Sequence, residues 1–124
     1  MKEYSKLYEG KIGVILTNLG TPNAPSKKAL KKYLNQFLMD KRVVDINRLV
    51  WLPILKLIIL NVRPKKSARL YSKIWTDKGS PLMVYMNNIK NEIVKKFSSK
   101  NSYQFEIAMR YGDPSFKKAL DTFK

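Results

Sequence analysis

Two runs of residues in this chain have the hydrophobic pattern of β-strands. Residues 12–16 are almost all apolar and rich in β-branched side chains, which predicts a strand buried on both faces. Apolar and polar residues alternate over residues 103–109, which predicts a second strand. Glycine, one further residue and proline follow each run, at residues 20–22 and 112–114, so a sharp loop is expected after each strand.

The first stretch with helical spacing follows Ser26, the expected N-cap. Its apolar stripe comprises Ala29, Leu30, Tyr33, Leu34, Phe37 and Leu38. Residues 40–42 are expected to close this helix, and Val43 with Val44 to form a short extended piece.

The most apolar stretch of the chain is residues 49–60. Asn47 is a candidate cap for a helix here, but Pro53 removes a backbone donor, so we expect two short helical pieces. Pro64 is expected to begin a further helix, which the turn at residues 79–81 ends. By their spacing of three and four residues, Ala68, Tyr71, Ile74 and Trp75 are predicted to fall on one face of this helix.

Another helical pattern starts at Leu82 and extends to Phe97, before a polar loop at residues 98–102. After the second strand, Asp113 and Pro114 are expected to be the N-cap and first position of a helix that begins within residues 116–123.

This order of strands and helices predicts an α/β fold with a parallel sheet. The carboxyl ends of parallel strands share one edge, and ligands of such folds bind there. Leu19, Arg110 and Tyr111 follow the strand cores and are therefore candidates to face a site, although ordinary turn chemistry also accounts for them.

Charge narrows the choice of partners. The 124 residues contain 25 Lys and Arg against 9 Asp and Glu, a formal net charge of +16, so anionic partners are expected. Many lysines lie on the polar faces of predicted helices, and no nucleic-acid-binding motif accompanies them. We therefore interpret most of them as solvated and expect no nucleic-acid partner. Non-specific binding to nucleic acid stays open as a hypothesis that steep salt dependence would support.

Several kinds of chemistry are missing from the sequence. It contains no Cys, which excludes disulfides and thiolate metal sites, and no His, the commonest general base. The carboxylates do not cluster at metal-ligand spacing, and neither a dinucleotide fingerprint nor a P-loop is present. What remains is a binding surface without an evident reacting group.

That surface combines apolar and cationic residues. The cations Arg63, Lys65, Lys66 and Arg69 directly follow the apolar residues 49–60. A flat apolar partner with anionic edges fits this arrangement, because apolar burial supplies affinity and the cations pair with carboxylates. A porphyrin with propionates is one such partner, and an anionic membrane surface is another.

The location is expected to be cytoplasmic. The first residues are too polar for a signal peptide, and residues 49–60 are too few to span a bilayer, which needs about 20. Residues 49–60 are expected to make peripheral contact with the inner face of the membrane. Vesicle binding that is lost in a chain with Trp51→Ser and Leu57→Ser would support that contact.

Five motifs in order make the chain similar to the amino-terminal part of ferrochelatases. They are Leu16-Thr-Asn-Leu-Gly-Thr-Pro22, Tyr33-Leu-x-x-Phe-Leu-x-Asp-x-Arg-Val-Val44, Arg63-Pro-x-x-Ser-Ala-x-x-Tyr71, Ile74-Trp-Thr-x-x-Gly-Ser-Pro-Leu82 and Ala108-Met-Arg-Tyr-Gly-x-Pro-Ser115. The resemblance implies a Rossmann-like lobe, a porphyrin held in a cleft between two such lobes, and ferrous iron as substrate with no required cofactor.

The resemblance also implies site residues. The porphyrin-contacting positions are Leu19, Arg63, Lys66, Tyr71, Ser80, Arg110 and Tyr111. Leu19 departs from relatives that have Tyr there and cannot ligate iron, so a packing role against the ring is implied. Taken singly, Arg63 is also explained as a surface cation, Tyr71 as a core ring and Ser80 as a turn residue.

The resemblance implies that the catalytic His and Glu lie in a second lobe, outside residues 1–124. We therefore expect the chain to be the first lobe of a truncated or fragmentary sequence, inactive alone, with no catalytic or metal-ligating residue of its own. The alternative is a cationic membrane-surface or interaction module without catalytic activity.

Overall fold

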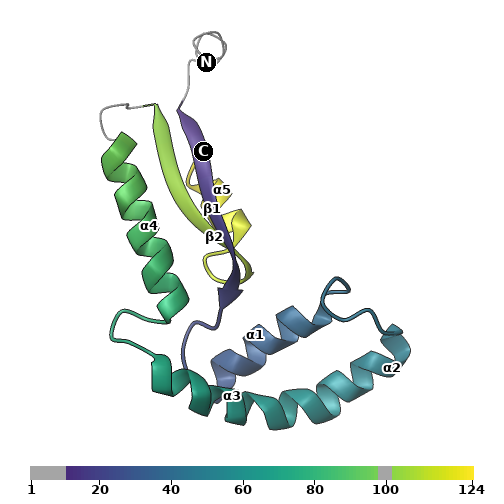
Figure 1. Ribbon diagram of the computed structural model, residues 1–124. Coiled ribbons are helices and arrows are strands. Elements are labelled where there is room, and N and C mark those ends of the chain that lie inside the picture. The colour runs from purple at the N-terminus through teal and green to yellow at the C-terminus, as the bar shows by residue number, and fades with distance from the viewer. Residues whose placement is uncertain (1–10, 98–101) are drawn as a thin grey trace.

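A parallel pair of strands forms the sheet in the computed structural model, which describes residues 11–97 and 102–124 (Figure 1). Strand β1 (Ile12–Thr21) pairs with β2 (Tyr103–Gly112), from Ile12 opposite Tyr103 to Thr21 opposite Gly112. The predicted α/β class with a parallel sheet is confirmed. The predicted polar segment at residues 1–10 and most of the loop at 98–102 lie outside the described residues.

Both strands run further than predicted. Residues 17–21, expected as a loop, continue β1, and Gly20 pairs with Tyr111. Gly20 has φ +118°, and a Cβ placed on it would lie 1.8 Å from the Tyr111 carbonyl oxygen. The strands can approach this closely only because a glycine stands there.

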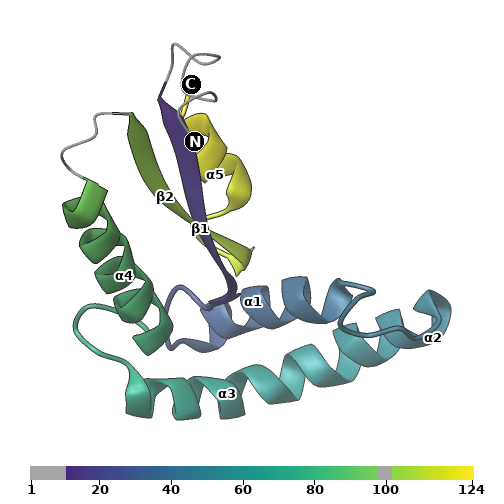
Figure 2. The same ribbon diagram turned by 45° about the horizontal axis from the view of Figure 1, so that its top comes forward.

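Helices cover the two faces of the sheet. Helix α4 (Pro81–Phe97) lies on one face and α5 (Phe116–Asp121) on the other, as Figure 2 shows. Met86 of α4 packs with Ile107 and Met109 of β2. The expectation that β1 is buried on both faces is wrong, since Ile12 is 45% exposed. Within the described residues β1 has one neighbouring strand, which leaves part of it open.

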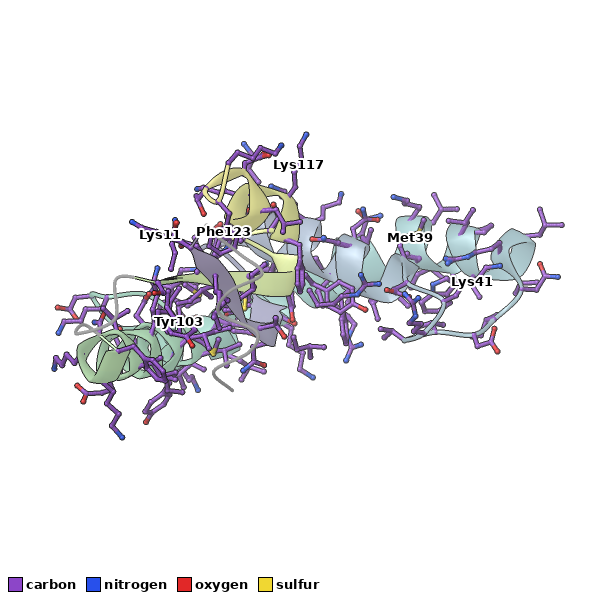
Figure 3. All side chains as sticks on the ribbon, turned by 90° about the horizontal axis from the view of Figure 1, so that it is seen from above. Lys11, Met39, Lys41, Tyr103, Lys117 and Phe123 are labelled. Atoms are coloured by element: carbon purple, nitrogen blue, oxygen red, sulfur yellow. The ribbon has the colours of Figure 1, made fainter. Side chains whose placement is uncertain are left out.

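The remaining helices form an arm that projects from the carboxyl ends of the strands (Figure 1). Helix α1 (Lys27–Met39) runs outward, and α2 (Arg48–Pro53), η2 (Ile54–Ile59) and α3 (Leu60–Ile74) return along it. The core of the arm contains Leu38, Trp51, Leu55 and Leu60. Seen from above, Met39 and Lys41 lie on the arm, away from Tyr103 and Phe123 at the sheet (Figure 3).

Two of the predicted helix starts are confirmed. The Ser26 hydroxyl accepts a hydrogen bond from the Ala29 N–H at 3.2 Å, and the Asn47 side chain accepts one from the Leu49 N–H at 2.9 Å. Val43 and Val44 were expected to be extended but lie in a turn, because both N–H groups donate to the Asp40 carbonyl at 3.0 Å.

The two short helical pieces predicted on either side of Pro53 are confirmed as α2 and η2. The predicted new start at Pro64 is wrong, because the path from Arg48 to Ile74 is helical throughout. Pro53 ends α2, and the wider π-helix η2 follows it. The Asn61 amide donates to the Leu57 carbonyl at 2.8 Å, which supplies a donor where the hydrogen-bond ladder changes. Pro64 is fully buried inside α3.

The cap of the last helix is also displaced from the prediction. Ser115 caps α5, with its hydroxyl 3.3 Å from the Lys118 N–H. Asp113 instead accepts a hydrogen bond from the Asn23 amide at 2.7 Å. Asp113 therefore connects the segments that follow the two strands.

Candidate functional site

One face of α1 lies against the carboxyl ends of both strands. It presents Tyr33, Gln36 and Phe37, and the C-cap Asp40 continues their spacing of three and four residues, which places side chains on one side of a helix. The Tyr33 hydroxyl donates to the Gly20 carbonyl at 3.2 Å. The N–H of Gly112 donates to the Gln36 side chain at 2.9 Å. These bonds hold the arm to the sheet edge where a site was predicted.

Asp40 brings Arg110 and Tyr111 together. Its Oδ2 accepts from Arg110 Nη2 at 2.6 Å and from the Tyr111 hydroxyl at 3.0 Å, while Oδ1 accepts from the Arg42 N–H at 2.9 Å. The hydrogen bond from Arg42, then those from Tyr111 and Arg110, lower the pKa of Asp40 to about 2. The carboxylate is therefore charged across the ordinary pH range.

Aromatic rings surround this cluster. The Phe37 and Tyr111 rings meet edge to face at 5.1 Å, and the guanidinium of Arg110 lies 5.5 Å from the centre of the Tyr111 ring. Such contacts add to the apolar burial of the rings. The sheet edge and α1 are thus joined by packing as well as by charge.

Tyr71 of α3 contributes to the same region. Burial raises its pKa. Burial, followed by repulsion from negative charge on Tyr71 and Tyr111, raises the pKa of Tyr33 to about 12. Tyr71 of α3 and Tyr111 of β2 thus both lie near enough to Tyr33 of α1 to raise its pKa.

Ser80 has a structural role in this structure. It is 2% exposed, and its hydroxyl accepts from the Met83 N–H at 3.3 Å in the first turn of α4. The interpretation of Ser80 as a turn residue that stabilises the next helix therefore holds, and its hydroxyl keeps an O–H donor that this bond does not use.

The other predicted residues lie in the open. Leu19, at the end of β1, is 53% exposed, and Arg63 and Lys66 are exposed on α3. The structure thus brings Arg110 and Tyr111 together on Asp40, while Tyr71 lies near enough to Tyr33 to raise its pKa. The side chains of Leu19, Arg63 and Lys66 are exposed on the surface and are not part of this cluster.

A pocket of about 260 Å³ opens beside α1 at the same edge. Its lining residues are Pro22, Asn23, Ser26, Lys28, Ala29, Lys32, Tyr33, Gln36, Gly112 and Asp113. None of the seven predicted residues lines it, and its volume lies below the range of about 300–1,000 Å³ that is usual for ligand sites. It is therefore not the hollow that was expected for a porphyrin.

The arm carries an exposed apolar stripe, which we define as Val50, Ile54, Leu57, Ile58 and Val62. Each of these side chains is at least 37% exposed. Trp51 by contrast is 8% exposed, and its indole N–H donates to the Leu38 carbonyl at 2.8 Å. Trp51 is therefore the wrong choice for a change meant to test surface contact, because it belongs to the core.

Sequence reasoning missed Asp40 and Gln36 as members of the site. The sequence places Asp40 at the end of a helix and within the second ferrochelatase-like motif but gives it no role in the site, and it gives Gln36 none either. The available signal was an acid at a helix C-terminus, where the helix dipole disfavours negative charge, so that strong compensating donors are required.

Metal-ligand clusters and membrane-spanning helices are both absent from the described residues. Over residues 11–97 and 102–124, no group of three or more His, Cys, Asp and Glu side chains is placed to hold a metal ion. In the same part of the chain, no helix has the length and apolar character needed to cross a membrane.

Comparison with known proteins assigns the family. The profile of the Ferrochelatase family matches residues 11–124. The chain is 51% identical over 109 residues to the ferrochelatase of Pseudoalteromonas atlantica, covering 86% of the chain and 30% of that protein. It is 49% identical over 109 residues to the ferrochelatase of Wigglesworthia glossinidia brevipalpis, covering 88% of the chain and 33% of that protein. The ferrochelatase of Azoarcus sp. is 49% identical over 112 residues, 90% of the chain and 31% of that protein.

The chain thus spans about a third of the length of the curated relatives it matches. The family profile covers residues 11–124, which contain all the described residues, including the strand ends and the arm. The chain belongs to the ferrochelatase family.

Proposed function

We propose that this chain supplies part of the porphyrin-binding wall of a ferrochelatase, an enzyme that inserts ferrous iron into a porphyrin. The observation that carries the proposal is the similarity to ferrochelatases over residues 11–124. The structure supports it with an exposed apolar stripe on the arm and exposed cations, Arg63 and Lys66, at the start of α3.

These groups match the chemistry of a porphyrin. Its flat apolar body gains free energy by leaving water against apolar side chains such as Leu19. Its propionates pair with cations, and Arg63 and Lys66 lie one helical turn apart on an exposed face. Arg110 and Tyr111 would stand at the rear of the same site, fixed by Asp40.

We assign the reacting groups to the rest of the protein. Iron insertion requires a base that removes the pyrrole protons, and residues 1–124 contain no His. In this proposal residues 1–124 correspond to the amino-terminal lobe, and the second lobe contributes the base and the path of the iron. The enzyme would act in the cytoplasm, at the inner face of the membrane.

A porphyrin titration tests the binding role. Protoporphyrin is added to the chain while its visible absorbance and the tryptophan fluorescence are followed. Arg63→Ala with Lys66→Ala is expected to weaken binding, because two exposed cations are lost. Lys117→Ala with Lys118→Ala removes the same charge from α5, on a face of the sheet, and is expected to leave binding nearly unchanged. If both variants lose the same porphyrin affinity, the binding is explained by non-specific attraction to the net positive charge of the chain.

An iron-insertion assay tests where the base lies. Ferrous iron and protoporphyrin are incubated with the chain without oxygen, and the absorbance bands of haem are followed. No haem above the uncatalysed background is expected from these residues alone. Catalysed haem formation would show that the chain holds its own base and would overturn the assignment to a second lobe.

The apolar stripe favours one further role, peripheral contact with an anionic membrane. We propose that Leu57 and Ile58, at 72% and 58% exposure, enter the lipid interface while neighbouring cations meet the headgroups. Co-sedimentation with phosphatidylglycerol-containing vesicles is expected to fall in the Leu57→Ser, Ile58→Ser variant. The matched control is Tyr85→Ser with Ile89→Ser, two exposed apolar residues of α4. Unchanged binding in the first variant would exclude the stripe as the contact.

A further inference from the structure

Asp40 stands at an electrostatically unfavourable place. It follows the last residue of α1, where the carbonyl ends of the helix concentrate partial negative charge. Its own carbonyl accepts from Val43 and Val44 at 3.0 Å, and its side chain accepts from the Arg42 N–H, so the turn fixes its position. The side chain is only 14% exposed. A carboxylate held here needs strong donors from outside the helix.

Strand β2 supplies those donors from two consecutive residues. Neighbouring residues of a strand normally point to opposite faces. Tyr111 is buried at 5% exposure and the Arg110 side chain is 50% exposed, yet both reach the same oxygen of Asp40. The long Arg110 side chain folds back over the Tyr111 ring to do so.

The pairing with Asp40 changes the charge that Arg110 presents to a ligand. A guanidinium 2.6 Å from a carboxylate forms a pair with little net charge, although it keeps further N–H donors. Arg63 and Lys66, exposed on α3, are not among the cations within 4.0 Å of an acid in the described residues. The Arg42 guanidinium also lies 4.0 Å from the Asp40 carboxylate, but the Arg42 side chain is 80% exposed and Arg110 is the closer cation at 2.6 Å. The two ends of the predicted site therefore differ: Arg63 and Lys66 on the arm have no acidic partner among the described residues, and Arg110 at the sheet edge is paired with one.

We propose that Asp40 is a positioning residue that masks the charge of Arg110, so that the carboxylates of an anionic ligand are directed to Arg63 and Lys66 on the arm and not to the rear of the site. This inference rests on the proposed porphyrin-binding role and adds the orientation of the ligand. The low pKa of Asp40 supports it, because the mask persists at every pH at which a propionate is charged.

The masking is tested first without a ligand. The chain is treated with phenylglyoxal, which modifies arginine, and the rate at each arginine is measured by peptide mass spectrometry. Asp40→Asn is expected to raise the rate at Arg110 several-fold, because the amide offers one oxygen where the carboxylate offered two. The rate at Arg63, exposed in any case, should not change. Arg48, which donates to the Met39 carbonyl inside the arm, reports unfolding if its rate rises as well.

Asp45→Asn is the matched control, an exposed acid in the connection between α1 and α2. An unchanged rate at Arg110 in Asp40→Asn would overturn the proposal. If Asp40→Asn unfolds the arm, the unchanged chain decides instead. Masking predicts that phenylglyoxal modifies Arg110 several-fold more slowly than the exposed Arg63, and that about 1 M NaCl, which weakens the ion pair, narrows the difference. Equal rates at the two arginines would overturn the proposal. The orientation of the ligand is tested with protoporphyrin and with coproporphyrin, which has more carboxylates.

The same two porphyrins test the orientation in the folded Asp40→Asn chain. Release of the Arg110 charge is expected to raise the relative affinity for coproporphyrin several-fold at low salt. Removing the arginine as well, in Asp40→Asn with Arg110→Met, should abolish that rise. A ratio unchanged by Asp40→Asn would refute the orienting role. Failure of both porphyrins to bind the unchanged chain would count against the proposed function, while the phenylglyoxal rates would still decide whether Asp40 masks Arg110.

Discussion

At the residue scale, Gly20 shows why β1 and β2 pair as closely as they do at their carboxyl ends. Its φ of +118° is disfavoured for other residues, and the Tyr111 carbonyl oxygen occupies the space that a side chain would need. Gly20→Ala is therefore expected to destabilise the chain by more than the roughly 1–3 kcal/mol of backbone strain alone. Urea unfolding followed by circular dichroism measures the change.

Gly79 provides the matched control for that substitution. Its φ is +110°, but no atom lies within 4 Å of the position that a Cβ would take. Gly79→Ala is expected to cost only the strain, about 1–3 kcal/mol. Equal losses of stability in the two variants would mean that the contact with Tyr111 is not a constraint.

Asp40 makes stability depend on acid pH. Its pKa is about 2 in the folded chain and 3.8 as the ordinary value, so folding favours the charged form. Its contribution is complete above about pH 4 and is lost as the pH falls through 4 toward 2. The urea midpoint of the unchanged chain should therefore fall more steeply over this window than that of Asp40→Asn. Parallel curves for the two chains would contradict the assignment, and Asp45→Asn should behave like the unchanged chain.

At the element scale, α2 closes the end of α1. The last carbonyls of a helix lack partners within it. Here the Trp51 indole donates to the Leu38 carbonyl at 2.8 Å, and the Arg48 guanidinium donates to the Met39 carbonyl. The connection between the two helices is thereby held by side chains of the second.

Trp51→Phe is expected to lower stability by about 1–3 kcal/mol, because a buried carbonyl loses its donor. Thermal unfolding by circular dichroism measures the loss. Trp75→Phe is the control variant, because it keeps the hydrogen bonds from Trp51 and Arg48 to the last carbonyls of α1. If the two variants lose the same stability, ring size and not the hydrogen bond accounts for the effect of Trp51.

Local signals predicted elements well and junctions poorly. Ser26 and Asn47 cap helices as expected, and both strands exist where their patterns placed them. The predictions failed at Pro64, which lies inside a continuous helix, and at Asp113, where a partner distant in sequence decides the outcome. In the site, the pairing of Arg110 with Asp40 spans 70 residues and has no local signature.

At the scale of the whole molecule, the described residues contain separate hydrophobic clusters. Leu55, fully buried, lies in the cluster of the arm, and Met109, 1% exposed, lies between the sheet and α4. The face of α1 that carries Tyr33 and Asp40 joins the two regions. The arm and the sheet are therefore expected to lose structure separately.

Hydrogen exchange tests this separation. Leu55→Ala, with an expected cost of about 2–5 kcal/mol, should reduce amide protection in α1 and in the helical path from Arg48 to Ile74, with β1 and β2 protected longer. Met109→Ala should show the reverse pattern. Uniform loss of protection in both variants would show a single cooperative unit.

The parallel pairing of β1 and β2 has a consequence for the order in which the chain acquires its structure. Everything from Pro22 to Ser102 intervenes between the strands, so closing that long loop carries an entropic cost before any sheet hydrogen bond forms. The helices of the arm are neighbours along the chain and meet at much lower cost. We therefore expect the antiparallel helices to form early and the strands to join late, with the register at Gly20 and Tyr111 among the last contacts made.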